Sequence, residues 1–183
     1  MSFLRLDADA MAEATAAMPD HIAAALSEPP GLPGGLSGER PSLVVVAGMG
    51  GSGVAGRVLE VLAAGSSPVP VLCAGGYLLP AFAGPGSLVV AVSFSGETEE
   101  TLEVAAAALE RGAALVAITS GGELARLAEG AGAPISRLPA GISRPRAAVA
   151  AMTAPLLLLA GELGLFPGAR SSLESCVSQL HKR

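Results

Sequence analysis

A chain of 183 residues is long enough for one domain with a sizeable core, and 51% hydrophobic against 15% charged residues excludes an intrinsically disordered chain. A formal net charge of −5 without a basic block argues against nucleic acid and an anionic membrane as partners. The uncharged apolar run 147–161 is too short to span a membrane and predicts a buried helix. The start of the chain lacks the regions of a signal peptide, so we expect a cytoplasmic location.

The expected elements begin with an Ala-rich helix at 7–26 and a Pro/Gly-rich linker at 27–41. Beyond them, short apolar segments typical of buried strands alternate with Ala-, Leu- and Glu-rich segments typical of helices. We expect strands at Leu43–Ala47, Val69–Cys73, Leu88–Val92, Ala114–Ile118 and Ala133–Ser136, and helices at 53–64, 97–110, 122–130 and 145–163, the last bent at Pro155. The Gly and Pro residues before residue 87 predict an irregular connection there.

Apolar strands that alternate with helices are typical of a parallel sheet covered on both faces. The sequence therefore predicts an α/β fold with a doubly wound, five-stranded parallel sheet flanked by helices. In such sheets ligands bind at the carboxyl ends of the strands, near the point where the strand order reverses. We divide the chain into an N-terminal helix and linker (1–40), a ligand-binding domain (41–165) and a tail (166–183).

The tail differs in composition from the rest of the chain. Lys182 is the only Lys and Gln179 the only Gln, whereas the body uses Arg for its cations. This change indicates a divergent or frame-shifted ending.

The first candidate site is the glycine-rich stretch Gly48–Gly53, which follows an apolar strand and precedes a helix. It matches G-x-G-x-x-G, so one hypothesis is a dinucleotide-binding domain. That motif expects an acidic residue about twenty positions later, yet no Asp or Glu occurs between Glu60 and Glu97. Two other interpretations of this stretch remain. It is either a tight turn between strand and helix, or a loop that binds a phosphate through its backbone N–H groups.

The second candidate loop, 93–98, also follows an apolar strand and offers three hydroxyls, Ser93, Ser95 and Thr98. One hydroxyl would suffice to cap the next helix, whose first acidic residues complement its dipole. If both loops meet at one end of the sheet, hydroxyls and backbone N–H groups together form a phosphate cup, which needs no basic residue.

Two further stretches carry weaker signals. The loop 118–123 predicts an N-cap or a further ligand contact. Arg146 lies at the start of the expected last helix, where the helix dipole disfavours a cation. Its side chain is therefore either solvated or placed beside an anion that removes the conflict. The two His and two Cys residues have no metal-ligand spacing, so we expect no metal, no disulfide framework and no cofactor.

The motifs GMGGSG, SFSGETEETL, ITSGGELARLA and PAGISRPRAAVA, in this order and spacing, resemble the N-terminal half of the bifunctional phosphoglucose/phosphomannose isomerases, members of the sugar isomerase (SIS) domain superfamily. The resemblance covers about residues 40–165. It implies a flavodoxin-like three-layer fold that occurs twice per chain, and a dimer with sites between domains. Partners implied are a hexose 6-phosphate and a second copy or a second SIS domain.

The resemblance also implies roles for individual residues. Gly51 and Ser52 would meet the sugar phosphate from the first loop, and Ser93, Ser95 and Thr98 would hold it from the second. Arg146 would contact the sugar and steady an enediolate; no residue is assigned as the catalytic base. In the family, the glutamate, His and Lys of aldose–ketose isomerisation lie in the second half, which we expect to be absent from this chain.

We therefore expect a sugar-phosphate-binding domain that is incomplete as an isomerase. The alternatives are a phosphosugar-sensing regulatory module without chemistry and the dinucleotide domain. Residues 1–40 carry an acidic balance and offer no DNA contacts, so a sensor would need a partner protein for that role.

Overall fold

The computed structural model describes residues 11–34 and 40–182 and shows a single five-stranded parallel sheet. The strands are β1 (Leu43–Ala47), β2 (Val71–Ala74), β3 (Ser87–Ser93), β4 (Ala114–Thr119) and β5 (Ile135–Arg137). Their order is β2-β1-β3-β4-β5, with every neighbouring pair parallel. The α/β fold with a doubly wound sheet is thus confirmed.

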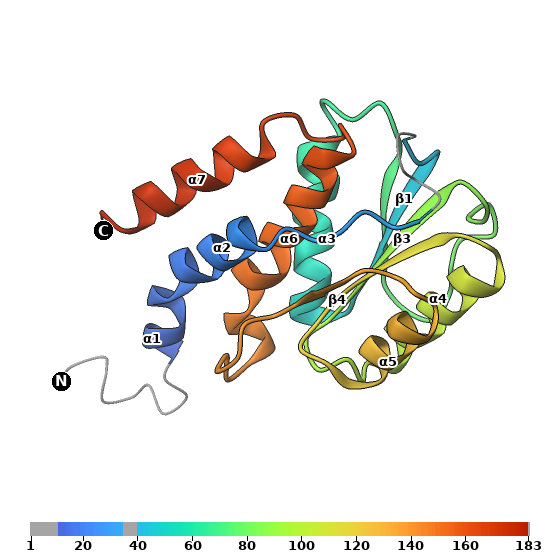
Figure 1. The fold of residues 1–183 in the computed structure, drawn as a ribbon, viewed down its shortest axis with the longest axis horizontal. Coiled ribbons are helices and arrows are strands. Elements are labelled where there is room, and N and C mark those ends of the chain that lie inside the picture. Colours follow the sequence, from blue (N-terminus) through green and yellow to red (C-terminus); the bar gives the residue numbers. More distant parts are fainter. Residues whose placement is uncertain (1–10, 35–39, 183) are drawn as a thin grey trace.

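Helices cover both faces of this sheet (Figure 1). The helices are α1 (Met11–Ala16), α2 (Met18–Ser27), α3 (Gly50–Ala63), α4 (Glu99–Glu110), α5 (Gly122–Gly130), α6 (Val149–Glu162) and α7 (Ala169–Leu180). Side chains alternate along each strand, so Val44 and Val46 pack into the core beneath α3 and α6, whereas Val45 packs into the core beneath α4 and α5. This alternation produces the three layers.

The central strands agree with the sequence prediction and the edge strands are displaced. β1 has its predicted bounds, and β3 and β4 are longer by one or two residues. β2 and β5 begin two residues later than predicted. An edge strand extends only as far as its single neighbour pairs with it. In β2 this pairing runs from Val71, opposite Val44, to Ala74, opposite Ala47. The connection from β2 to β3 contains neither helix nor strand, as predicted.

Four predicted helices are corrected, and one of them, α4, begins at Glu99 rather than at residue 97. The predicted helix 7–26 is interrupted at Ala17, because Pro19 in the first turn of α2 has no N–H to donate to a carbonyl of the preceding turn. Residues 7–10 of this prediction lie outside the described residues. α3 begins three residues earlier than predicted. The predicted helix 145–163 divides into a 3-10 turn, η2 (Pro145–Ala147), and α6, which continues through Pro155.

The tail forms helix α7, which packs against α2 and α6. Ala169 and Leu173 are its buried residues, and Leu173 joins the core on the α6 side. Among the described residues no helix is long and apolar enough to cross a membrane.

Candidate functional site

Two loops meet at the carboxyl edge of the sheet, where the strand order reverses. β1 and β3 are neighbours, with Ala47 opposite Ala91. The chain leaves β1 for α3 on one face and leaves β3 for α4 on the other face. The loops 48–53 and 93–98 therefore flank the switch point, the usual ligand position in this class of fold.

Ser52 connects the two loops. Its side chain is buried, and its Oγ accepts a hydrogen bond from the N–H of Phe94 at 3.3 Å. The same hydroxyl lies 3.3 Å from Sδ of Met152 in α6. These contacts span 42 and 100 residues of sequence, so no local pattern could reveal Phe94 and Met152 as supports of the site.

The first loop presents backbone N–H groups rather than side chains. Gly50 has a φ of +52°, and the N–H groups of Ser52 and Gly53 both donate to the carbonyl of Met49. The N–H groups of Gly50 and Gly51 precede any helical acceptor, as in the first turn of every helix. A Cβ on Gly51 would lie 3.2 Å from the carbonyl oxygen of Pro145, so only a small residue lets η2 approach this loop.

The three hydroxyls of the second loop have different surroundings. Ser93 is buried; its Oγ accepts from the N–H of Gly96 at 3.1 Å and lies 2.9 Å from Oγ1 of Thr98. Ser95 is exposed, and its Oγ accepts from the N–H of Glu97 at 3.1 Å. Thr98 is the N-cap of α4 but makes no side-chain capping bond. Simple capping of α4 therefore does not account for these hydroxyls.

The third loop holds the second loop in position. The N–H of Ser120 donates to the carbonyl of Phe94, and the N–H of Leu124 donates to the carbonyl of Gly96. Thr119 is fully buried, and its hydroxyl donates to the Gly121 carbonyl and accepts from the Gly121 N–H within the same loop. Oε1 of Glu97 accepts from the N–H of Glu123, at the start of α5.

Arg146 approaches the first loop from a third direction. It lies in η2, whose backbone at Pro145 and Arg146 packs against Gly51. Its side chain is exposed, and within the described part of the chain it forms no ion pair. A cation is thus adjacent to the N-terminus of α3, a position where an anion would be stabilised.

The histidine on α2 lies apart from these loops. His21 lines a hollow of about 640 Å³ whose lining includes no residue of 48–53 or 93–98. Burial lowers the pKa of His21 from its ordinary value. In the described ranges no group of three or more His, Cys, Asp or Glu side chains is arranged to hold a metal ion.

Comparison with known proteins identifies the family. The SIS domain family model matches residues 41–154. The bifunctional phosphoglucose/phosphomannose isomerase of Caldicellulosiruptor bescii is 39% identical over 137 residues, which cover 75% of this chain and 40% of that protein. The chain thus spans about two fifths of the length of this curated relative.

Solved structures share the fold at low sequence identity. Tagatose-6-phosphate ketose/aldose isomerase from Escherichia coli superposes with a TM-score of 0.61 at 17% identity, covering 94% of this chain and 51% of that chain. The Vibrio vulnificus NanR protein complexed with ManNAc-6P superposes with a TM-score of 0.55 at 16% identity, covering 94% and 68%. The solved structures show that the fold is shared with a phosphosugar isomerase. The family model covers more than half of the chain and shows that the chain belongs to the SIS domain family.

Proposed function

We propose that the chain binds a hexose 6-phosphate, with its phosphate held between the loops 48–53 and 93–98. The observation that carries this proposal is the bond from the Phe94 N–H to Ser52 Oγ, which holds the two loops together at the switch point. Backbone N–H groups at one helix start and hydroxyls at the next converge there on one anion.

In this proposal the site residues have different roles. Gly50 and Gly51 donate backbone N–H groups, and Ser95 and Thr98 donate hydroxyls, since an accepting hydroxyl can also donate. Ser52 and Ser93 are buried, and their hydroxyls hold the second loop in place by accepting from the N–H groups of Phe94 and Gly96. Arg146 contacts the sugar and the developing charge of an enediolate when the reaction is completed by further residues.

Several observations support a sugar phosphate over a dinucleotide. The relative from Caldicellulosiruptor bescii is named for phosphoglucose and phosphomannose, and NanR was solved with ManNAc-6P. β2 ends at Ala74 and is followed by Gly75 and Gly76, where a dinucleotide site would carry a carboxylate for the ribose.

We further propose that the chain alone binds without isomerising its ligand and that it pairs with a second unit of the same fold. Proton abstraction at carbon 2 needs a base within hydrogen-bond reach, and Glu97, the acidic residue inside the second loop, already accepts from the Glu123 N–H. The preference for glucose or mannose, a sensing role and the expected cytoplasmic location stay predictions.

Isothermal titration calorimetry with glucose 6-phosphate, fructose 6-phosphate and mannose 6-phosphate tests the proposal, with free glucose and NAD as controls. We expect saturable binding of the phosphorylated sugars only. At a ligand concentration of 100 times the dissociation constant, the bound sugar phosphate should raise the free energy of unfolding by about 2.7 kcal/mol. Absence of binding at millimolar sugar phosphate, or preferential binding of NAD, contradicts it. A coupled assay for fructose 6-phosphate formation tests turnover separately.

A further inference from the structure

The hollow that His21 lines lies beside β5, at the edge of the sheet opposite β2. Its volume is about 640 Å³, and it is bordered by α2, by the residues that follow α2, by β5 and by α6. Ligand pockets in proteins have volumes of about 300–1,000 Å³. We call this cavity the β5-edge hollow, and it is large enough for a small molecule.

His21 offers a hydrogen-bond donor to the β5-edge hollow. Burial lowers the pKa of His21 from its ordinary value, so the ring is neutral at pH 7 and carries a single N–H. Nδ1 is buried without a partner among the described residues. A proton on Nδ1 would be a buried N–H without an acceptor, which is costly, so the proton belongs on Nε2. The N–H of Nε2 is the group that remains for a ligand.

Helix α6 offers a hydrogen-bond acceptor to the same hollow. Pro155 lies inside α6 and has no N–H, so the carbonyl of Ala151, four residues earlier, lacks its usual helical donor. Both residues line the β5-edge hollow. A ligand with an N–H group can replace the missing donor.

The backbone of β5 offers both donors and acceptors. The carbonyl of Pro134 and the N–H of Leu138 bond to β4. Alternate residues of a parallel strand bond to the same neighbour, so the backbone groups of Ile135 and Arg137 point away from β4 to the free edge of the sheet. Ile135 and Arg137 both line the β5-edge hollow.

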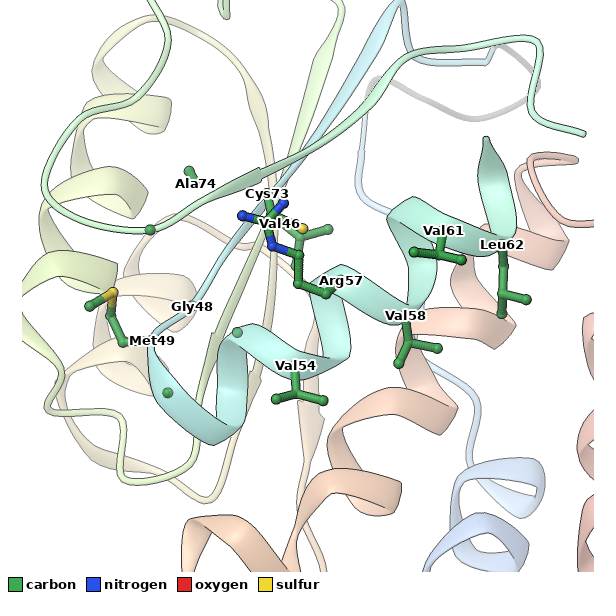
Figure 2. Close-up of a pocket in the computed structure, with 13 residues that line it drawn as sticks. Val46, Gly48, Met49, Val54, Arg57, Val58, Val61, Leu62, Cys73 and Ala74 are labelled. Atoms are coloured by element: carbon green, nitrogen blue, oxygen red, sulfur yellow. The ribbon is translucent and has the colours of Figure 1, made fainter. Parts of the chain in front are cut away.

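The opposite edge of the sheet is different. At β2, Oε1 of Glu60 accepts a hydrogen bond from the N–H of Cys73 at 3.3 Å, so a side chain of the protein already occupies this edge. The hollow beside it has a volume of about 630 Å³ and a largely apolar lining, which includes Val54, Val58 and Leu62 of α3 (Figure 2). Open backbone groups beside a hollow are therefore a feature of the β5 edge.

Little net charge faces the β5-edge hollow. Arg137 forms an ion pair with Glu129 of α5 at 2.6 Å. Glu28, the other lining residue that is charged at pH 7, is exposed to solvent, which screens its charge. Because His21 is neutral as well, the hollow favours a neutral ligand over an anion or a cation.

Proline rings form much of the remaining lining. They come from three separate segments, the residues after α2, the residues after β5, and α6: Pro29, Pro30, Pro139 and Pro155. Proline rings and flat aromatic rings pack closely on each other, as in the grooves that bind proline-rich peptides. The walls of the hollow therefore suit a planar ring.

We propose that the β5-edge hollow binds a neutral, planar ring that carries an amide-type group, an N–H donor beside a C=O acceptor. Carboxamides, lactams and nucleobases belong to this class. The ligand N–H donates to the Ala151 carbonyl, its C=O accepts from Nε2 of His21, and the backbone of Arg137 pairs with its remaining polar atoms. No lining residue belongs to the loops 48–53 and 93–98, so this site is additional to the sugar-phosphate site.

NMR titration of the ¹⁵N-labelled full chain with benzamide tests the inference. Benzoate and benzylammonium are matched probes of the same size that carry a negative and a positive charge. We expect benzamide to shift the backbone amide signals of Ile135 and Arg137 with a dissociation constant of about 1 mM. Both charged probes should bind about tenfold more weakly, because nothing in the hollow balances their charge.

Two substitutions change the hollow in different ways. Pro155→Ala supplies the missing N–H to the Ala151 carbonyl and is expected to weaken benzamide binding about tenfold, the effect of losing one hydrogen bond. Ala24→Tyr, at an exposed position of the lining, fills the hollow and is expected to abolish benzamide binding. Ala16→Tyr, at an exposed position of α1 outside the lining, is its matched control and should bind benzamide as the wild type does.

Three results would overturn the inference. One is the absence of shifts in the Ile135 and Arg137 signals at about 20 mM benzamide, well above the expected dissociation constant. The others are equal binding of the three probes, and benzamide binding that survives both Pro155→Ala and Ala24→Tyr. Should Pro155→Ala alter the course of α6, Ala24→Tyr still tests the site, because Ala24 lies on α2.

Discussion

The Oγ atom of Ser52 lies 3.3 Å from the backbone nitrogen of Phe94, so a residue at the start of α3 fixes the loop that precedes α4. The two helices leave opposite faces of the sheet, and this bond holds their N-termini side by side. The geometry of the candidate phosphate cup depends on it.

Replacement of Ser52 by Ala tests this link. We expect the free energy of unfolding to fall by about 1–3 kcal/mol, because the Phe94 N–H loses its acceptor, and sugar-phosphate binding to weaken with it. Urea denaturation and calorimetry measure the two effects. Ser178→Ala, at an exposed hydroxyl that donates to the Glu174 carbonyl, should change stability by less than about 0.5 kcal/mol. Equal effects of the two substitutions would contradict the role of Ser52.

Ser95 and Ser93 are expected to respond differently to Ala. Ser95 is exposed, so Ser95→Ala should leave the melting temperature unchanged and reduce sugar-phosphate affinity about 10- to 100-fold, the effect of losing one hydrogen bond to a charged group. Ser93→Ala removes a buried acceptor of the Gly96 N–H and should lower stability as well. The double variant should lose binding and retain its fold. Unchanged affinity in the double variant would show that these hydroxyls serve only the loop.

Arg146→Ala should weaken sugar-phosphate binding about tenfold without changing the melting temperature, because the side chain is exposed. Arg146→Lys should recover only part of the affinity, since an ammonium lacks the planar fork of a guanidinium. Arg126→Ala removes an exposed arginine that is paired with Glu123, and it serves as the control in the same titration. Equal losses in the Arg146 and Arg126 variants would indicate a general charge effect.

Gly96 allows the second and third loops to touch. Its φ is +76°, and a Cβ there would overlap the carbonyl oxygen of Gly121. Gly96→Ala should lower the free energy of unfolding by about 2 kcal/mol or more. Gly130→Ala, at the end of α5 with open space around the added methyl, should be neutral or slightly stabilising. Thermal denaturation of both variants decides whether this contact is needed.

His21 predicts a loss of stability in acid. Burial lowers its pKa below the ordinary value of 6.5, and Asp20 raises it to a smaller extent. A lowered pKa in the folded state means that the neutral form stabilises the fold above pH 6.5, and that this contribution is lost as the pH falls through the lowered value. Between pH 7 and pH 5 the melting temperature of the wild type should therefore fall further than that of His21→Gln. His181→Gln, at an exposed position, should follow the wild type.

The amino-acid sequence by itself determined the fold class, the bounds of β1 and the residues of both candidate loops. The fold class depends on the alternation of local strand and helix segments along the chain, and the other two depend on the residues next to each other in sequence. A wholly apolar run such as Leu43–Ala47 indicates a buried strand, and a run of glycines after it indicates a turn into a helix.

Only the tertiary structure decided which loops are neighbours and how their hydroxyls are used. The order β2-β1-β3-β4-β5 places the loop after β1 beside the loop after β3, although β2 lies between them in sequence. Ser52 then bonds to Phe94 and Met152, 42 and 100 residues away, so its side chain supports the site from within. Such contacts arise from how the strands pair and the helices pack, and the residues around Ser52 in the sequence carry no signal of them.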